Sequence, residues 1–278
     1  MKYCIAIFCI MLFGSFSRPP KPANTAHTFS KIMLASSGCF GTCPMELILI
    51  DSNRNVLFQG IRYTNTIGLY TAKMPERMYK HILEAFSKVD IDTLKNRYET
   101  RWTDLETITV LFEKNGKIYK SIEDYGHKAP YEYQAAYTYL RNVYSKLKLK
   151  QTLFPDSTEK ALFYYFTQGK YIYYLNGLQS MLLYDYLRNG VATQDTYTAK
   201  YELKEHSYTM KLTVTDTVPT QANISSDGRY YTIKYKNKKP VTIDIGFNFF
   251  ERNMNMFDKD STDAKKPVDD DIQFKQIK

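Results

Sequence analysis

The sequence predicts an α+β fold: an N-terminal antiparallel sheet with two helices on one face, followed by a helix pair and an antiparallel β meander. Two observations predict it. In the first half, pairs of apolar runs around polar turns alternate twice with segments of helical periodicity. In the second half, short tyrosine-rich runs of strand type follow one another between turn signals. The order hairpin, helix, hairpin, helix packs most simply as one sheet with both helices on one face.

The elements of the first half follow from their turns and starts. The first hairpin is predicted over residues 45–50 and 56–60, around a polar turn. The second joins residues 107–112 to 118–122 through Asn115-Gly116, a dipeptide typical of tight hairpin turns. A proline opens each helix, Pro75 before the first and Pro130 before the second, because proline is tolerated in the first helical turn.

The second half is predicted to be a helix pair and then strands. Ser157-Thr158-Glu159 is typical of a helix start, and Tyr165 and Phe166 would lie on the apolar face of that helix. A second helix is predicted over residues 177–187. Strands are then expected over residues 197–204, 208–215, 229–236 and 241–250.

These elements divide the chain into five parts. We expect a signal peptide (1–17), a flexible tether (18–30), an α+β domain with the cysteine motif (31–149), a mixed domain (157–257) and a charged, disordered tail (258–278). The boundary between the domains falls where periodicity stops around Pro155. Asp and Lys dominate the tail, which therefore lacks the apolar residues needed for a core.

The N-terminus indicates export. Lys2 precedes an apolar run over residues 3–13, and the small residues Ser15 and Ser17 stand before a plausible cleavage site at Arg18. The run is shorter than the ~20 residues that a membrane-spanning helix needs. We therefore expect a periplasmic or extracellular protein, without a transmembrane segment in the mature chain. The net charge of +9 comes from scattered lysines, and export makes nucleic acid an unexpected partner.

The cysteines hold the main chemical question. Cys39 and Cys43 are the pair that remains once the leader, with Cys4 and Cys9, is removed. Two thiols four residues apart can form a disulfide, hold a metal, act as a redox pair or stay free. In an oxidising compartment such a pair usually forms a structural disulfide, which is the role we favour. No cofactor is predicted.

The motif Cys39-Phe40-Gly41-Thr42-Cys43-Pro44, followed by an apolar strand and a hairpin, resembles exported bacterial domains of the domain-of-unknown-function family 6438. The resemblance extends over roughly residues 30–149. It also includes Tyr98, Thr103-Asp104-Leu105, the Asn115-Gly116 hairpin, Asp124-Tyr125-Gly126 and Pro130. This family has no established activity, so the resemblance implies a domain and no mechanism.

A Cys-x3-Cys-Pro motif is also similar to the copper site of Sco-type assembly proteins, where two thiolates and a distant histidine bind the metal. In this chain His81 or His127 would supply the third ligand. In those proteins the motif leads into a helix, whereas here Pro44 leads into a predicted strand. That difference weakens the metal and redox alternatives.

Hydrolytic chemistry has little support. The four histidines show no zinc-ligand spacing, and there is no Gly-x-Ser-x-Gly elbow. Four acids border the second hairpin, where turn and capping roles are the usual ones: Asp104, Glu106, Glu123 and Asp124. We therefore predict an exported, non-catalytic module that binds a protein, peptide or glycan partner or belongs to an envelope assembly. The alternative is a thiol-dependent copper or redox protein that uses Cys39 and Cys43.

Overall fold

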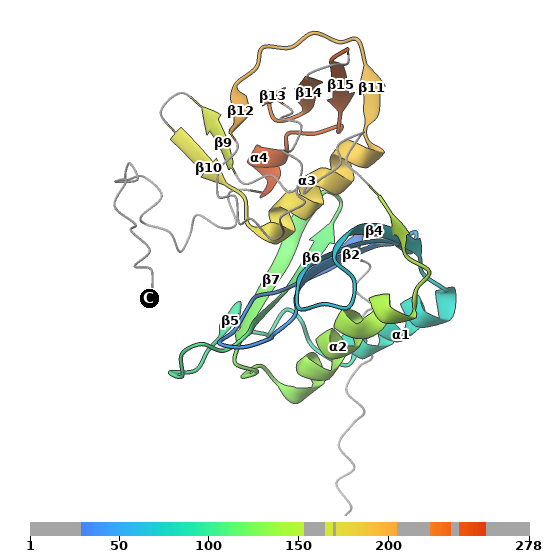
Figure 1. Ribbon diagram of the computed structural model, residues 1–278, viewed down its shortest axis with the longest axis vertical. Coiled ribbons are helices and arrows are strands. Elements are labelled where there is room, and N and C mark those ends of the chain that lie inside the picture. Colours follow the sequence, from blue (N-terminus) through green and yellow to red (C-terminus); the bar gives the residue numbers. More distant parts are fainter. Residues whose placement is uncertain (1–28, 153–164, 169–170, 205–222, 235–238, 254–278) are drawn as a thin grey trace, which may run out of the picture.

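The computed structural model describes residues 29–152, 165–168, 171–204, 223–234 and 239–253. The predicted leader, the predicted tail, most of the tether, residues 157–164 of a predicted helix and the predicted strand 208–215 lie outside these residues. The described parts stack in layers: two helices, an eight-stranded sheet, a third helix and a seven-stranded sheet (Figure 1). No helix among them is long and apolar enough to cross a membrane.

The first sheet has the strand order β5-β7-β6-β1-β2-β3-β4-β8. Its neighbours pair antiparallel, except that β5 runs parallel to β7. The turn Asn115-Gly116 joins β6 to β7, with φ of 52° and 80° at its two residues. The strands are β1 Lys31–Ser36, β2 Met45–Asp51, β3 Asn55–Arg62, β4 Gly68–Lys73, β5 Arg97–Tyr98, β6 Thr107–Lys114, β7 Lys117–Tyr125 and β8 Lys150–Gln151.

Helices α1 (Glu76–Ser87) and α2 (Tyr131–Asn142) cover one face of this sheet, and a 3-10 turn, η1 (Val143–Lys146), follows α2. Ile82 of α1 and Tyr133 and Leu140 of α2 pack in one core with Ile32, Ile108 and other apolar side chains of the central strands. Because β2 and β6 are buried almost throughout, the other face of the sheet must also be covered.

Helix α3 (Gly177–Asn189) covers that second face. Nine of its thirteen residues are buried, on all sides of the helix, which is the pattern of a helix enclosed between two layers. One side contacts Met33, Leu47 and other residues of the first sheet, and the other contacts the second sheet. Asn176 and Gln179 form a reciprocal capping box at the start of α3, which satisfies two backbone N–H groups there.

The second sheet has the order β10-β9-β12-β13-β14-β15-β11 and pairs antiparallel throughout. A short helix, α4 (Phe249–Asn253), follows its last strand, and Asn253 accepts a hydrogen bond from the Ile118 N–H of β7. The strands are β9 Tyr165–Gln168, β10 Tyr171–Tyr174, β11 Val191–Thr193, β12 Tyr201–Lys204, β13 Asn223–Ser226, β14 Tyr230–Lys234 and β15 Val241–Asp244.

Strands dominate both halves, in sheets of eight and seven strands with few helices, so the predicted α+β fold class is wrong. The first sheet is mixed rather than antiparallel and extends beyond two hairpins. β4 adds a further hairpin with β3, and β8 and β5 join through their pairing with β4 and β7. Tyr165 and Phe166, assigned above to a helix face, belong to β9, so no helix pair is formed by the described residues. Phe249 and Phe250, predicted to end a strand, lie in α4.

Candidate functional site

The disulfide loop and two other loops meet at one end of the first sheet. In the register of the strands, Ser36 at the end of β1 pairs with Glu46 of β2 and with Ile108 of β6. Thr107, at the start of β6, pairs with Tyr125 at the end of β7. The loops over residues 37–44, 99–106 and 126–130 therefore lie together, and we call this place the loop end of the sheet.

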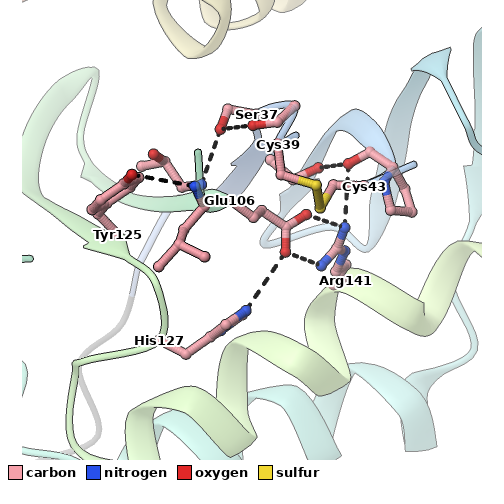
Figure 2. The surroundings of a disulfide bond; sticks show 12 residues. Ser37, Cys39, Cys43, Glu106, Tyr125, His127 and Arg141 are labelled. Carbon is pink, nitrogen blue, oxygen red and sulfur yellow. Dashed lines mark hydrogen bonds and ion pairs between the residues drawn. A yellow bond between two sulfur atoms is a disulfide. The ribbon is translucent and has the colours of Figure 1, made fainter. Parts of the chain in front are cut away.

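Cys39 and Cys43 form a disulfide in the loop between β1 and β2 (Figure 2). Backbone contacts tie this loop to the next one. The Phe40 N–H donates to the Asp104 carbonyl at 3.0 Å, and the Ser37 N–H donates to the Thr107 carbonyl at 2.9 Å. The disulfide thus closes a small ring whose tip, Phe40, is 90% exposed. The disulfide and these backbone hydrogen bonds thus fix the position of an exposed aromatic side chain.

Below the ring, Arg141 of α2 joins two buried carboxylates, a group we call the Arg141 cluster (Figure 2). Its Nε donates to Glu46 at 2.9 Å, and its Nη1 and Nη2 donate to the two oxygens of Glu106 at 2.9 and 2.6 Å. Nη2 also donates to the Pro44 carbonyl at 3.2 Å. One side chain therefore fastens α2 to the disulfide loop, to the start of β2 and to the loop before β6. Its rigid fork suits such a task.

The pKa values of the cluster follow its burial. Burial raises the pKa of the Glu46 carboxyl, and the hydrogen bond and positive charge of Arg141 oppose that change. For Arg141, burial lowers the pKa of the guanidinium, but the hydrogen bonds to Glu106 and Glu46 outweigh it and the pKa is raised. Arg141 is therefore the fixed positive charge of this cluster.

A second chain of polar contacts holds the turn before α2. Asp124 is fully buried and accepts from the N–H groups of Lys128 and Ala129 at 2.6 and 3.0 Å. Tyr137 donates its hydroxyl proton to Asp124 at 2.9 Å. The Tyr137 oxygen therefore accepts from His127 Nδ1, at 2.8 Å. His127 Nε2 lies 3.7 Å from Glu106, so the ring stands between Tyr137 and the Arg141 cluster.

The structure separates the residues that the sequence singled out. Cys39, Cys43 and His127 lie at the loop end, whereas His81 lies on α1, where its ring packs edge-on against Tyr139 of α2. Within the described ranges, no group of three or more His, Cys, Asp and Glu side chains is arranged to hold a metal ion.

The four acids at the second hairpin do not converge as a pair. Glu106 pairs with Arg141, and Asp124 supports the turn before α2. Glu123 lies 3.5 Å from Arg97, and the backbone of Asp104 takes a positive φ of 64°. Arg141 and Glu46 were not predicted as site residues. The apolar surroundings of Glu46 in a strand and of Arg141 on a helix were the available signals, since a charged residue at a core position needs a partner.

Exposed apolar side chains also gather at the loop end. The loop between β3 and β4 reaches it too, because Met45 of β2 pairs with Arg62 of β3. Of the eight large apolar side chains that are exposed in the described part of the chain, five lie on these loops. We call them the apolar loop row: Phe40, Tyr63, Ile67, Trp102 and Leu105.

Comparisons with known proteins give one match. No curated protein and no solved structure matches the chain. The model of one protein family does match, and its range ends before α3, so it includes the disulfide loop and the Arg141 cluster and leaves out the second sheet. Residues 30–144 of this chain match the model of that family, the domain of unknown function DUF6438, which is the family that the sequence resembles.

Proposed function

We propose that this chain is an exported, non-catalytic binding module whose working surface is the loop end of the first sheet. The observation that carries the proposal is a 90% exposed Phe40 at the tip of a disulfide ring, fastened from below by Arg141. A flexible loop would lose conformational freedom on binding. A loop ordered beforehand avoids most of that cost.

The polar groups near the disulfide support a structural role rather than catalysis. Arg141 uses its donors on Glu46, Glu106 and Pro44, and Asp124 accepts three hydrogen bonds. A general acid or base needs a proton that it can exchange with a substrate. These groups instead form hydrogen bonds within the protein, and those bonds hold the loop that carries Phe40 and its neighbours in place.

Export is the first part of the proposal that can be tested. The leader-like N-terminus predicts a mature chain that begins at or near Arg18. The natural protein should be recovered outside the cytoplasm with this N-terminus and with Cys39 and Cys43 oxidised. A cytoplasmic product that retains Met1 and two free thiols would contradict the proposal.

The order of the loop end, on which the proposed binding role depends, is tested by hydrogen exchange on the chain with Cys39→Ser and Cys43→Ser. The loops over residues 37–44 and 99–106 should exchange faster, while the amides of β1, β2 and β6 keep their protection, because the disulfide orders only the loop end. Thr42→Ser is the matched control, since it alters the same ring and leaves the disulfide intact.

Copper binding by the reduced wild-type chain tests the thiol-dependent alternative. His127 lies at the loop end with both cysteines, which is the observation in its favour. After reduction, the wild-type chain would then bind one copper ion, and His127→Ala would weaken that binding. Stoichiometric copper in the protein as isolated would replace our proposal with this one. Loops whose exchange rate does not depend on the disulfide would contradict our proposal without supporting copper binding.

A further inference from the structure

We infer that the apolar loop row is a docking surface for another protein, bound reversibly through an apolar strip on that partner. The inference rests on the proposed function and names the partner class for the same loop end. Its members come from three separate loops: Phe40 from the first, Tyr63 and Ile67 from the second, and Trp102 and Leu105 from the third. No single stretch of sequence would produce this clustering by its own composition.

The row has the dimensions of an interface core. It extends from the start of β6 to the turn between β3 and β4, across four strand spacings, which is roughly 20 Å. Trp102 is 66% exposed and Ile67 is 56% exposed. Taking large apolar side chains as about 200 Å² each, the row offers roughly 600 Å² of accessible surface. A standard reversible interface buries about 800 Å² on each partner, so the row supplies most of one.

The loops are ordered before any partner arrives. The disulfide and the Phe40 N–H bond to Asp104 hold the first loop. In the second, Thr64 Oγ1 donates to the Thr66 carbonyl at 2.8 Å. A Cβ at Gly60 would collide with that same carbonyl, so this loop folds tightly back on its strand. In the third, the Leu105 N–H donates to the Tyr125 hydroxyl at 3.2 Å.

The charges around the row favour a protein over a lipid surface. Exposed cations on these loops are balanced by exposed acids, with Asp104 standing inside the row between Trp102 and Leu105. An anionic bilayer attracts clusters of one sign, which this end of the sheet lacks. Two arginines instead stack on their neighbouring rings, Arg62 over Tyr63 at 4.4 Å and Arg101 over Trp102 at 6.0 Å. Aromatic and arginine side chains are the residues most enriched at protein contacts.

The exposed area of the apolar loop row favours a different protein as the partner over a second copy of this chain. Obligate homodimers bury well above the standard area and are more apolar. The row falls below that range, so its size fits a reversible contact with a different protein.

Trp102 makes the test direct, because it is the one tryptophan of the chain and lies in the row. The probe is a displayed library of random 12-residue peptides, panned on the full mature chain. Selected peptides should be rich in apolar residues and should shift Trp102 emission to the blue. Phe40→Ser and Ile67→Ser should each weaken their binding at least tenfold, about 1.4 kcal/mol. Val191→Ser is the matched control, since Val191 is 70% exposed on β11 of the other sheet.

Four results would overturn the inference. The library yields no binder, or neither Phe40→Ser nor Ile67→Ser changes the affinity of the selected peptides. Phosphatidylcholine or phosphatidylglycerol vesicles shift Trp102 emission, which would indicate a lipid surface. Sedimentation shows a dimer that Phe40→Ser dissociates, which would indicate a second copy. Hydrogen exchange on the double cysteine variant, measured without peptide, shows separately whether the proposed function fails.

Discussion

Each face of the first sheet carries a partly exposed cation between two buried carboxylates, and the two groups are built differently. On the face under α2, Arg141 donates to Glu46 and Glu106 at 2.6 to 2.9 Å. On the face under α3, Lys31 lies 3.4 Å from Glu113 and 3.5 Å from Asp185, a group we call the Lys31 cluster. The Arg141 cluster lies at the loop end and the Lys31 cluster at the opposite end, where β1 begins.

The difference teaches what each cluster does. A guanidinium fixes direction as well as charge, so the Arg141 cluster can hold three chain segments in register beside the disulfide. An ammonium is a point charge, and the longer Lys31 distances indicate charge compensation with little directional control. The Arg141 cluster lies wholly inside the family match, residues 30–144, whereas the Lys31 cluster takes Asp185 from α3 outside it. Directional hydrogen bonds thus position the chain segments at the loop end, whereas α3 is held on the sheet mainly by the burial of its apolar side chains.

The largest expected effect comes from removing the cation of the Lys31 cluster. Lys31→Met leaves Glu113 and Asp185 buried without their counter-charge, which should lower the free energy of unfolding by about 3–5 kcal/mol. The urea midpoint of the full chain measures it. Adding Glu113→Gln and Asp185→Asn should recover most of the loss, because no buried charge then remains. If Lys31→Met is as stable as the wild type, the cluster has no part in attaching α3.

One leucine on each side of the first sheet allows the helices that cover its two faces, α2 and α3, to be compared. Leu140 of α2 and Leu182 of α3 are both fully buried, one on each face of the sheet. Either change to alanine should cost about 2–5 kcal/mol. The two variants should differ in hydrogen exchange. Leu182→Ala should speed the exchange of the second sheet while the amides of β1, β2 and β6 stay protected. Leu140→Ala should speed the exchange of both sheets together. Identical exchange patterns would mean that both sheets unfold as one unit and that the predicted boundary after residue 149 has no cooperative meaning.

The disulfide should contribute less than either core. Its ring is short, so Cys39→Ser with Cys43→Ser should lower stability by about 1–2 kcal/mol. The Arg141 cluster limits the damage, because Pro44 and Glu46 keep their bonds to the guanidinium. Adding Arg141→Met should therefore cost more than the two separate changes predict, since both fasten the same loop. Strict additivity in thermal unfolding would show that ring and cluster act independently.

The smallest effect is a dependence on pH. Because burial raises the Glu46 pKa above its usual 4.5, the folded state holds the proton more tightly than the unfolded state. The contribution of Glu46 to stability is thus fully present below pH 4.5 and is lost as the pH rises through the raised pKa. Glu46→Gln cannot ionise, so wild-type stability should fall relative to this variant over that window. A difference that stays constant with pH would contradict the direction of the shift.

Local signals predicted individual elements better than their assembly. Asn115-Gly116 and the two prolines act within a few residues, and the structure has a turn and two helix starts at those places. The strand β4 is half-buried along its length and shows no alternation, so only its pairing with β3 makes it a strand. Phe249 and Phe250 read equally well as strand or helix. Contact with the core near β7 decides for the helix, and such contacts are not visible in a short window.

The candidate site was predicted only in part for the same reason. Cys39 and Cys43 are only four residues apart, so the sequence alone indicates that they can form a pair. Arg141 reaches Glu46 across 95 positions of sequence and Glu106 across 35, which no spacing rule captures. The apolar loop row is further removed, because its members are scattered in sequence and become neighbours only through strand register.

The burial of α3 on all sides also bears on the order in which the chain can assemble during synthesis. The strands of the first sheet are complete at Gln151, whereas the helix that covers their second face ends at Asn189. At ~5–20 residues per second, that face waits about 2–8 s for its cover. During this interval Met33, Leu47 and Leu111 would be open to water, or to any chaperone that holds apolar strands. A pause in translation before Asn189 would prolong that exposure.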